Sequence, residues 1–538
     1  MAIAGDTVWE LRSGATAGNV NGGGFSAIQA VASGGTGVDY SQQNGAQYSL
    51  TGLTSAGAGN VILTASAAAD MQGNLIHITA GTNFNVGWYT INSVVAGVSL
   101  TCSTNGASQS VASGIGAAGT GEIGGAISLG AANDDAVFEA TAVANIMWMK
   151  AGTYTLGGVV SIARSSSAAN PIMVFGYNTT RGDNPKGTNV NGLTRPIIDS
   201  GANNFTVGAQ WLWKYVEFTS ASISGLIPGT RSNYEYCKML NTTTTDFRSA
   251  IAPSVGSAFY MCEIQSYRGY GVLTSSASVL LLNCYIHDSR YGVANNQASA
   301  PIYVVNCVFR NINVDSARMV GATTYKVYLI NCTFHGCNNT GQALNHPTGN
   351  ANAALTGSNI SNFATGVLVT DATQGMLDEY NNYFDNTTDV TLWTKGTGDV
   401  AVDPGFAVTD VTGTAATTSG SVLTDGSKDF TALGVVAGRD FLFITSGTGV
   451  TTGYYGITVV GTTTLTLDIA PGTDATADKV YQISVGANFA PGAGIRAVGN
   501  PGVLPGGYTT GYQDIGAIQA RATGSSEAGL SLIGPRLT

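Results

Sequence analysis

Short runs of alternating apolar and polar residues fill the middle of the chain, and one such run recurs every 22 to 25 residues. Val, Ile, Tyr, Phe and Thr dominate these runs, and Gly and Asn separate them, so the period of two predicts β-strands joined by turns. A cysteine marks five successive copies, at spacings of 25, 22, 23 and 25 residues. The five are Cys237, Cys262, Cys284, Cys307 and Cys332.

The length of the repeat selects an architecture. Leucine-rich repeats need a regular leucine ladder, and helical repeats are longer and follow a helical period; the chain shows neither pattern. A β-solenoid remains, in which each repeat is one coil and coils stack about 4.8 Å apart. Stacking sets equivalent residues above one another, so the cysteines are expected to form one inward-facing structural ladder. Val216 upstream and Asn382 downstream are expected in the same register.

Residues of the opposite parity should point out of the coils. The position three residues after the cysteine gives His287, Arg310 and His335 on consecutive coils, with Asp288 and Arg290 at the following turn. This column is the candidate for catalysis or binding, and the alternative is a turn face exposed to water. Further charged residues expected near it are Arg268, Asp315 and Arg318.

The stretch "LINCTFHGC" (329–337) combines two cysteines with a histidine, as a metal site does. Zinc needs about four converging ligands. Cys332 and His335 have opposite parity on one strand and should point to opposite faces, while Cys337 follows at the turn. We therefore expect no metal site and no cofactor here, and free apolar thiols instead.

Tyrosines gather in the same third of the repeat region. Those of outward parity are candidates for stacking on sugar rings or for packing against another subunit, and both remain open. The tripeptide "RGD" (181–183) lies in a Gly- and Asn-rich turn, where a chance occurrence is expected. The tyrosines assigned to glycan or subunit contact are Tyr267, Tyr270, Tyr285 and Tyr291.

Composition narrows the class of protein. Charged residues are 10% of the 538, against about 25% in typical domains. The hydrophobic share of 44% is too high for a disordered chain, and no apolar run approaches the roughly 18 residues that span a bilayer. A net charge of −10 with 22 Lys and Arg argues against nucleic acid as a partner. The first residues lack a basic start and an apolar run, so no Sec signal peptide is expected.

Five short motifs stand at the two ends of the repeat region: "MKAGTYTL" (149–156), "NPIMVFGYN" (170–178) and "RPIIDS" (195–200) before it, and "VDPGF" (402–406) and "YQDIGAIQ" (512–519) after it. The first three resemble the entry coils, and the last two the closing motifs, of right-handed parallel β-helix proteins, the pectate-lyase-like superfamily. Within it, the chain most resembles phage tailspike and virion surface proteins. The resemblance implies an all-β chain built on a right-handed parallel β-helix.

An insertion separates the two closing motifs, and it resembles the N-terminal segment. "LIHITAGTNFNVGWYTINSV" (75–94) aligns without gaps to "FLFITSGTGVTTGYYGITVV" (441–460), so we expect a duplicated small β-module. The expected domains are an N-terminal β-rich attachment and assembly domain (1–130), the β-helix (131–406), the inserted module (407–486), and a closing coil with the C-terminal tail (487–538).

The resemblance implies three functions, since the same solenoid carries enzymes, adhesins and virion parts. The favoured one is a phage or phage-like virion protein, a spike, fibre or capsid-decoration protein with an adhesive or assembly role. It would be a homotrimer on the virion surface, attached to other virion proteins through the N-terminal domain, with host surface polysaccharide as a further candidate partner. The alternatives are a polysaccharide lyase or glycoside hydrolase, whose chemistry the outward column would supply, and a bacterial surface adhesin.

Overall fold

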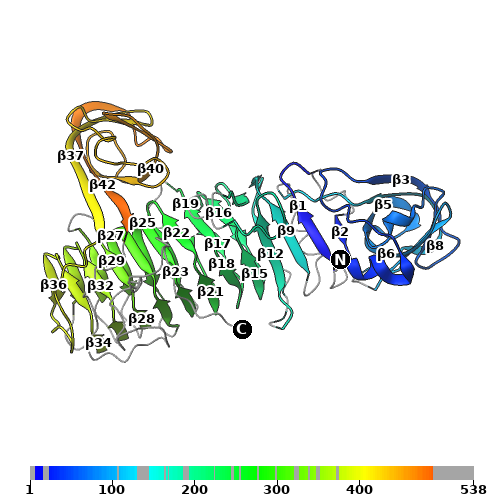
Figure 1. Ribbon diagram of the computed structural model, residues 1–538, viewed down its shortest axis with the longest axis horizontal. Coiled ribbons are helices and arrows are strands. Elements are labelled where there is room, and N and C mark those ends of the chain that lie inside the picture. Colours follow the sequence, from blue (N-terminus) through cyan, green and yellow to red (C-terminus); the bar gives the residue numbers. More distant parts are fainter. Residues whose placement is uncertain are drawn as a thin grey trace, which may run out of the picture. The chain divides into compact units, whose positions relative to one another are not determined.

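The computed structural model describes residues 7–488 apart from short gaps (Figure 1). The chain divides into two compact units, Met1–Lys238 and Met239–Thr538. Residues 487–538 were expected to close the coil, and "YQDIGAIQ" lies in this part; from 489 onward it is outside the described residues. The gaps are 16–22, 106–107, 130–144, 163–164, 166, 168, 186–192, 223, 244–247, 254–255, 275–277, 297–299, 320–325, 337–339, 347–351 and 371–374.

The expected all-β class and parallel β-helix are confirmed. Strands form a β-solenoid of about eight turns with coils of about 24 residues, and β-barrel-like modules accompany it. The helices of the described residues are short: α1 (Ala27–Val31), η1 (Ala32–Gly34) and η2 (Ala69–Met71).

The first unit contains a six-stranded antiparallel sheet ahead of its coils. Its order is β3-β8-β5-β6-β7-β4. Its apolar face forms a closed core around Leu53, Ile76, Ile78 and Tyr89. The strands are β3 (Tyr48–Leu53), β4 (Val61–Leu63), β5 (Leu75–Phe84), β6 (Gly87–Val95), β7 (Ser99–Cys102) and β8 (Ala112–Ile123).

The coils of the first unit are built from parallel strands in register. One inward column runs through Trp9, Met147, Val174, Trp213 and Tyr234, each fully buried. The parallel strands of this series are β1 (Val8–Leu11), β9 (Ile146–Lys150), β12 (Ile172–Tyr177), β15 (Trp211–Lys214) and β18 (Asn233–Glu235), and β2 (Gly24–Phe25) pairs antiparallel with β1. The other series are β10 (Thr153–Thr155), β13 (Ile197–Asp199) and β16 (Glu217–Ser220), and β11 (Val160–Ser161), β14 (Phe205–Thr206) and β17 (Ser224–Ile227).

The coils of the second unit continue this pattern with three strands per turn, and β19 (Lys238–Asn241) lies at the boundary of the units. The first series is β21 (Ser257–Tyr260), β24 (Val279–Leu282), β26 (Ile302–Val305), β28 (Lys326–Ile330), β31 (Asn352–Thr356) and β34 (Gly375–Glu379). The second is β22 (Glu263–Ser266), β25 (Tyr285–Asn295), β27 (Val308–Met319), β29 (Thr333–His335), β32 (Asn359–Ser361) and β35 (Asn382–Phe384). The third adds β20 (Ser249–Ile251), β23 (Tyr270–Thr274), β30 (Gln342–His346), β33 (Thr365–Val369) and β36 (Thr388–Thr391).

The cysteines occupy equivalent places in these coils. The residues after Cys262, Cys284, Cys307 and Cys332 pair with one another from strand to strand, and all four thiols are buried and free. The amide of Cys284 donates a 3.3 Å hydrogen bond to the Sγ of Cys307. Cys237, in the first unit, is also buried and free.

A sharp turn before each cysteine explains the recurring asparagine. Asn283, Asn306 and Asn331 have φ values of 56°, 52° and 52°, in the left-handed region. Asparagine tolerates this conformation better than most residues. The "NC" pairs in the sequence are therefore the bend of each coil followed by its inward side chain.

The register expected at Asn382 is wrong by one residue. Thr333 pairs with Asn359, which pairs with Asn382, so Asn382 follows the outward column. The cysteine position is taken by Ser358 and then by Asn381, whose Oδ1 accepts a 2.9 Å hydrogen bond from the Ser358 amide. The pattern misled because neither coil carries the cysteine that marks the others.

A closed barrel, β37-β38-β41-β40-β39-β42, follows the last coil described. Its strands enclose a core of aliphatic and aromatic side chains that includes Leu442, Ile444, Tyr455 and Phe430. It covers Ala407–Asn488, where the sequence placed the inserted module at 407–486. The strands are β37 (Ala407–Ser419), β38 (Val422–Thr424), β39 (Phe441–Ser446), β40 (Gly453–Val460), β41 (Thr464–Leu467) and β42 (Asp474–Asn488).

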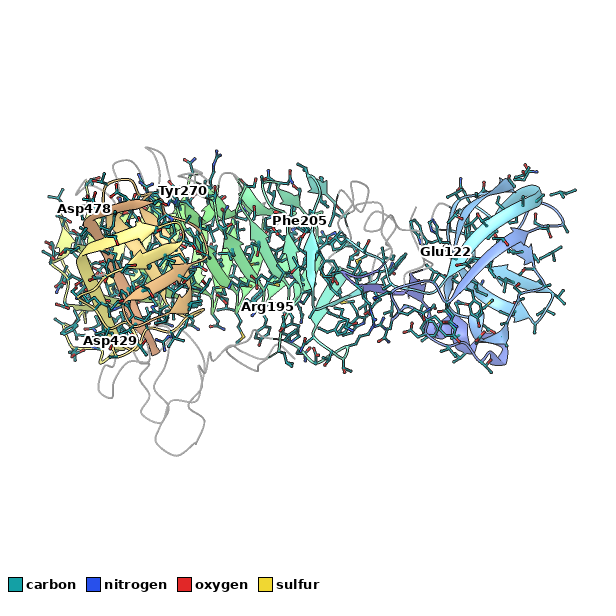
Figure 2. All side chains as sticks on the ribbon, turned by 90° about the horizontal axis from the view of Figure 1, so that it is seen from above. Glu122, Arg195, Phe205, Tyr270, Asp429 and Asp478 are labelled. Carbon is teal, nitrogen blue, oxygen red and sulfur yellow. The ribbon has the colours of Figure 1, made fainter. Side chains whose placement is uncertain are left out.

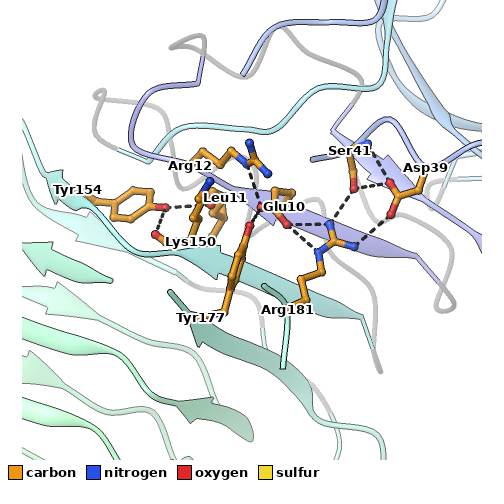
Figure 3. Close-up of polar contacts among 9 residues, drawn as sticks. All are labelled: Glu10, Leu11, Arg12, Asp39, Ser41, Lys150, Tyr154, Tyr177 and Arg181. Carbon is orange, nitrogen blue, oxygen red and sulfur yellow. Dashed lines mark hydrogen bonds and ion pairs between the residues drawn. The ribbon is translucent and has the colours of Figure 1, made fainter. Parts of the chain in front are cut away.

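Arg181 of the "RGD" tripeptide joins two distant segments of the first unit (Figure 3). Arg181 forms ion pairs with the fully buried Glu10 at 2.7 Å and with Asp39 at 3.1 Å. The carboxylate of Asp183 accepts hydrogen bonds from the amides of residues 178–180. Arginine and aspartate thus fix a turn and pair a buried carboxylate, which is a structural role.

The inward column of β21 to β34 ends on a carboxyl group. Phe259, Leu281, Val304, Leu329 and Leu355 lead in register to Asp378, which is 4% exposed. Burial and then the nearby Asp399 carboxylate raise the pKa of Asp378 to about 7. Its Oδ1 accepts hydrogen bonds from Asn381 and Tyr383, and its Oδ2 has no hydrogen-bond partner.

We expect Asp378→Asn to stabilise the protein at alkaline pH and to leave it nearly unchanged at acidic pH. The folded pKa lies above the ordinary 3.8, so the native state binds the extra proton and wild-type stability falls as pH rises from about 4 through 7. The amide removes that fall, a gain of about 2–4 kcal/mol above pH 8. Urea unfolding at both pH extremes measures it; the same pH dependence in both proteins would contradict it.

Candidate functional site

The barrel packs on the outer side of the coils within the second unit. Figure 2 shows Asp429 and Asp478 on the barrel and Tyr270 on the solenoid beside it. Tyr267 of the coils forms a buried apolar cluster with Phe443 and Tyr454 of the barrel. The hydroxyl of Tyr454 donates to the backbone carbonyl of Asn311, and that of Tyr267 donates a 2.6 Å hydrogen bond to Asp468. Apolar and polar contacts together define one junction.

The predicted column of His287, Arg310 and His335 lies beneath this junction. The three residues pair in register on β25, β27 and β29, as the parity predicted, but none faces open water. His287 contacts the ring of Phe441 at 6.0 Å, and His335 contacts that of Phe406 at 5.7 Å. The alternative of a water-exposed turn face is therefore wrong, because a later segment of the chain covers the column.

Arg310 anchors the barrel. It is 2% exposed, donates from Nη2 to the backbone carbonyl of Ser484, and lies 3.8 Å from the carboxylate of Asp440. Burial lowers the pKa of Arg310, but Tyr285, Asp288 and Asp440 together raise it above the ordinary value. The guanidinium is therefore charged, and it joins solenoid to barrel.

His287 is held between two carboxylates. Its Nδ1 lies 2.6 Å from Asp288, and its Nε2 lies 3.2 Å from Glu263. Burial lowers the pKa of His287, but the hydrogen bonds to Asp288 and then Glu263 outweigh it, and the pKa is raised. Asn311 fixes the other oxygen of Asp288 at 2.8 Å. Both ring nitrogens of His287 and both carboxylate oxygens of Asp288 thus have partners, which suits a structural role better than proton transfer to a substrate.

We expect His287 to add to the loss of stability of the second unit as pH rises above 6.5, beside the loss that Asp378 causes as pH rises through about 7, and His287→Gln to remove the part due to His287. A folded pKa above the unfolded one stabilises fully below pH 6.5, and the contribution disappears as pH rises through the folded pKa. Hydrogen bonds between charged groups suggest about 1–3 kcal/mol. Urea unfolding from pH 6.5 upward measures this change in the free energy of unfolding. His335 does not interfere, because burial lowers its pKa to about 4 and its titration changes stability only at acidic pH. Parallel pH profiles for wild type and variant would refute the prediction.

The four predicted tyrosines divide between two places. Tyr285, which is half-buried, stacks on His287 at 4.1 Å, and Tyr267 contacts the barrel ring of Phe441 at 6.1 Å. Tyr270 and Tyr291 stack on each other at 4.5 Å on neighbouring strands. Both are less than a tenth exposed, with Leu273, Ala294 and Val314 packed around them.

Charged groups surround the stacked pair. Asp315 follows Tyr291 in the same ladder, and Arg318 lies 3.5 Å from its carboxylate. Burial raises the pKa of Asp315 to about 6. The guanidinium groups of Arg290 and Arg318 lie 5.5 and 5.4 Å from the ring of Tyr291. Arg290 and Asp315, both singled out from the sequence, thus meet at this ladder, apart from His287 and Asp288.

A cleft opens next to this ladder, between the coils and the barrel. Its volume is about 190 Å³. Arg268 donates a 2.6 Å hydrogen bond to the hydroxyl of Tyr455 across it. Gly453 has a φ of 139°, and a Cβ there would lie 3.0 Å from Nε of Arg268, so only glycine leaves this wall open. The lining residues are Tyr267, Arg268, Arg290, Asn313, Val314, Phe443, Thr445, Thr452 and Gly453.

The cleft's chemistry matches an anionic, hydroxyl-rich ligand. Its lining side chains offer two guanidinium groups, an amide, two threonine hydroxyls and two aromatic rings, and no carboxylate. Guanidinium groups bind carboxylates and phosphates with paired hydrogen bonds, and aromatic rings suit sugar faces. Sequence reasoning found three of the four polar or aromatic residues that the coils supply, and it missed the barrel's Thr445 and Thr452 because no local pattern shows where an insertion docks.

The suspected metal motif separates as parity predicted. Cys332 is buried in the coil interior, while His335 lies against Ser361 at 3.0 Å and the barrel side. Cys337 lies outside the described residues. Among the residues that the structure describes, no three His, Cys, Asp or Glu side chains gather as metal ligands do. No helix in the described part of the chain is long and apolar enough to cross a membrane.

The fold resembles solved β-helix proteins. Pectate lyase Pel9A is 13% identical with a TM-score of 0.34, covering 51% of this chain and 76% of its own. The tailspike protein of E. coli bacteriophage HK620, as a double mutant, is 10% identical with a TM-score of 0.26, covering 64% and 87%. The parallel pairing of the chain's own strands shows that it has a β-helix fold.

Another β-helix protein of similar fold is tailspike gp49 of Acinetobacter baumannii bacteriophage Fri1, a capsular polysaccharide depolymerase. It is 10% identical with a TM-score of 0.27, covering 63% of this chain and 79% of its own. No protein-family model matches the sequence, and no curated protein matches it. At these identities the likeness concerns the fold, and function has to be argued from the chain's own residues.

Proposed function

We propose that this β-helix protein is an adhesive surface spike of a phage or phage-like virion, and that the cleft beside the barrel binds an acidic saccharide of the host surface. The observation that carries the proposal is the pairing of Arg268 and Arg290 in a cleft whose lining has no carboxylate. In a chain of net charge −10, two arginines converging on one cavity favour a specific anionic ligand.

The size of the cleft limits the ligand. About 190 Å³ is smaller than the roughly 300–1,000 Å³ of typical drug-sized sites, so it suits one sugar unit or a chain end. Tyr267 and Phe443 offer ring surface, while Asn313 and Thr452 offer hydrogen bonds to hydroxyl groups. The ligand that fits best is a single uronate-like or otherwise anionic unit with its neighbours outside.

Assembly as a homotrimer, with the N-terminal domain joined to other virion proteins, belongs to the same proposal. Support comes from an apolar stripe on the outer face of the first strand series. Tyr303 and Tyr328 stack at 5.0 Å there, in register with Leu377, and Tyr303 and Leu377 are 41% and 49% exposed. Exposed apolar stripes of this kind are typical of association surfaces.

The assembly is tested by light scattering and SDS electrophoresis without heating. The proposal expects a trimer, and Tyr303→Lys is expected to shift it toward monomer while the far-ultraviolet circular dichroism stays unchanged. A wild type that is monomeric at micromolar concentration would contradict the assembly.

Adhesion is tested by binding to acidic polysaccharide with Arg290→Ala, and Lys326→Ala serves as a charge-matched control on another strand series.

A polysaccharide-cleaving enzyme is the second candidate, and Asp315 is the observation that favours it. A carboxyl group with a pKa of about 6, beside Arg318 and the Tyr270–Tyr291 pair, has the character of a general acid. Cleavage would create new reducing or unsaturated ends with wild-type protein, and Asp315→Asn would abolish them without abolishing binding. Binding without any new ends supports the adhesive spike instead.

A further inference from the structure

The N-terminal sheet and the barrel are two copies of one six-stranded module. Taken in chain order, the strands of both copies occupy the same places: β3-β8-β5-β6-β7-β4 in the first and β37-β42-β39-β40-β41-β38 in the second. The copies differ in extent at the edge: three residue pairs join β37 to β38 and close the barrel, whereas a single bridge, Thr54 to Leu63, joins the end of β3 to β4. A shared order of six strands extends the likeness well beyond the aligned 20 residues.

The central hairpin has the same register in both copies. Ile76 pairs with Tyr89, as Leu442 pairs with Tyr455. The hydroxyl of Tyr89 donates to the carbonyl of Asn85, and that of Tyr455 to the carbonyl of Thr451, four residues earlier in each case. These tyrosines belong to the core of their own module.

The opposite face of the hairpin carries an aromatic pair in both copies. His77 stacks on Trp88 at 4.2 Å, and at the aligned positions Phe443 packs on Tyr454 at 4.6 Å. All four side chains are less than a tenth exposed, and the three apolar ones, Trp88, Phe443 and Tyr454, lie outside the hydrophobic core cluster of their own module. Something outside the module therefore buries them.

In each copy an aromatic side chain of a solenoid coil packs against the aromatic pair. Trp88 meets Trp9 edge to face at 6.1 Å, and Trp9 lies in β1, the strand paired in parallel with β9. Phe443 and Tyr454 enclose Tyr267, which follows β22. Edge-to-face and tilted aromatic contacts add about 0.5–1.5 kcal/mol beyond their buried area.

We infer that the duplicated module is a β-helix-docking module, whose binding surface is the aromatic pair of its central hairpin and whose partner is an aromatic side chain presented by a coil. The module's core holds its own strands together, and the pair attaches it to the solenoid. The inference does not depend on saccharide binding. It implies that one attachment surface serves both for the start of the solenoid and for an insertion on its flank.

The test uses the full chain and measures side-chain accessibility by hydroxyl-radical footprinting. In Phe443→Ala/Tyr454→Ala, Tyr285 and Phe441 at the junction are expected to gain oxidation several-fold, while Phe430 and Tyr481 in the barrel core stay protected. Tyr267→Ala attacks the same contact from the coil, leaves the barrel's own sequence intact, and is expected to expose Phe441 likewise. Unchanged oxidation of Phe441 in both variants would overturn the inference, as would loss of protection in the barrel core.

Exchange of the pairs tests whether the surface is shared. In His77→Phe/Trp88→Tyr the first copy receives the second copy's pair, and Trp9 is expected to stay protected. In His77→Ala/Trp88→Ala, Trp9 is expected to become oxidised several-fold while Tyr89 in the module core stays protected. If the exchanged pair exposes Trp9 as much as the alanine pair does, the two surfaces are not equivalent and the inference fails.

Discussion

Arg310→Ala is expected to lower the free energy of unfolding of the second unit by about 3–5 kcal/mol, the usual cost of removing one partner from a buried ion pair. The substitution takes away the donor to the Ser484 carbonyl and the cation facing Asp440, both on the barrel. Asp288, whose charge also acts on Arg310, stays buried. Urea unfolding followed by tyrosine and tryptophan fluorescence measures the change, and limited proteolysis shows whether the barrel separates first.

Lys395→Ala is the matched control. Lys395 also forms an ion pair, with Asp389 at 2.5 Å, but the two side chains are 35% and 28% exposed. Pairs in contact with water are worth about 0–1 kcal/mol, so the control is expected to stay within about 1 kcal/mol of wild type. Equal losses from Arg310→Ala and Lys395→Ala would mean that Arg310 is no anchor.

Phe334→Ala is expected to cost about 3–5 kcal/mol, because it empties a fully buried position in the coil interior. Its ring stacks at 4.7 Å on Phe309 of the preceding coil, so the cavity lies inside an aromatic ladder. Tyr328→Ala removes a ring from a similar ladder, stacked at 5.0 Å on Tyr303, on the outer face. In urea unfolding of monomeric protein, where no subunit contact is lost, the outer substitution is expected to cost less than about 1 kcal/mol. Similar costs at the two positions would contradict the assignment of inner and outer faces.

The solenoid could be predicted from the sequence because every coil repeats the same pattern of inward and outward residues. A period of two assigns the faces of each strand, and the spacing of the cysteines gives the length of a coil. His287, Arg310 and His335 therefore lie in register as expected. The predicted register was wrong in the last coils, because Ser358 and Asn381 occupy the cysteine position there and the sequence pattern follows the cysteines.

What surrounds the column of His287, Arg310 and His335 could not be predicted from the sequence. Parity states that Arg310 points away from the coil interior, but it does not state what lies there. The answer comes from Ser484 and Asp440, more than a hundred residues later, brought back by a module that follows the last coil. The cleft has the same origin, because Thr445, Thr452 and Gly453 form one of its walls.

The most direct measurement is calorimetric binding of an acidic oligosaccharide and of its carboxyl-reduced counterpart to wild type, Arg290→Ala and Lys326→Ala. If the cleft binds an acidic saccharide, wild type and Lys326→Ala bind the acidic ligand. Carboxyl reduction of the ligand, or Arg290→Ala in the protein, weakens binding by about tenfold or more, because charge-assisted hydrogen bonds contribute about 1.5–3 kcal/mol. Equal affinity for the acidic and reduced ligands, or full binding by Arg290→Ala, would contradict it.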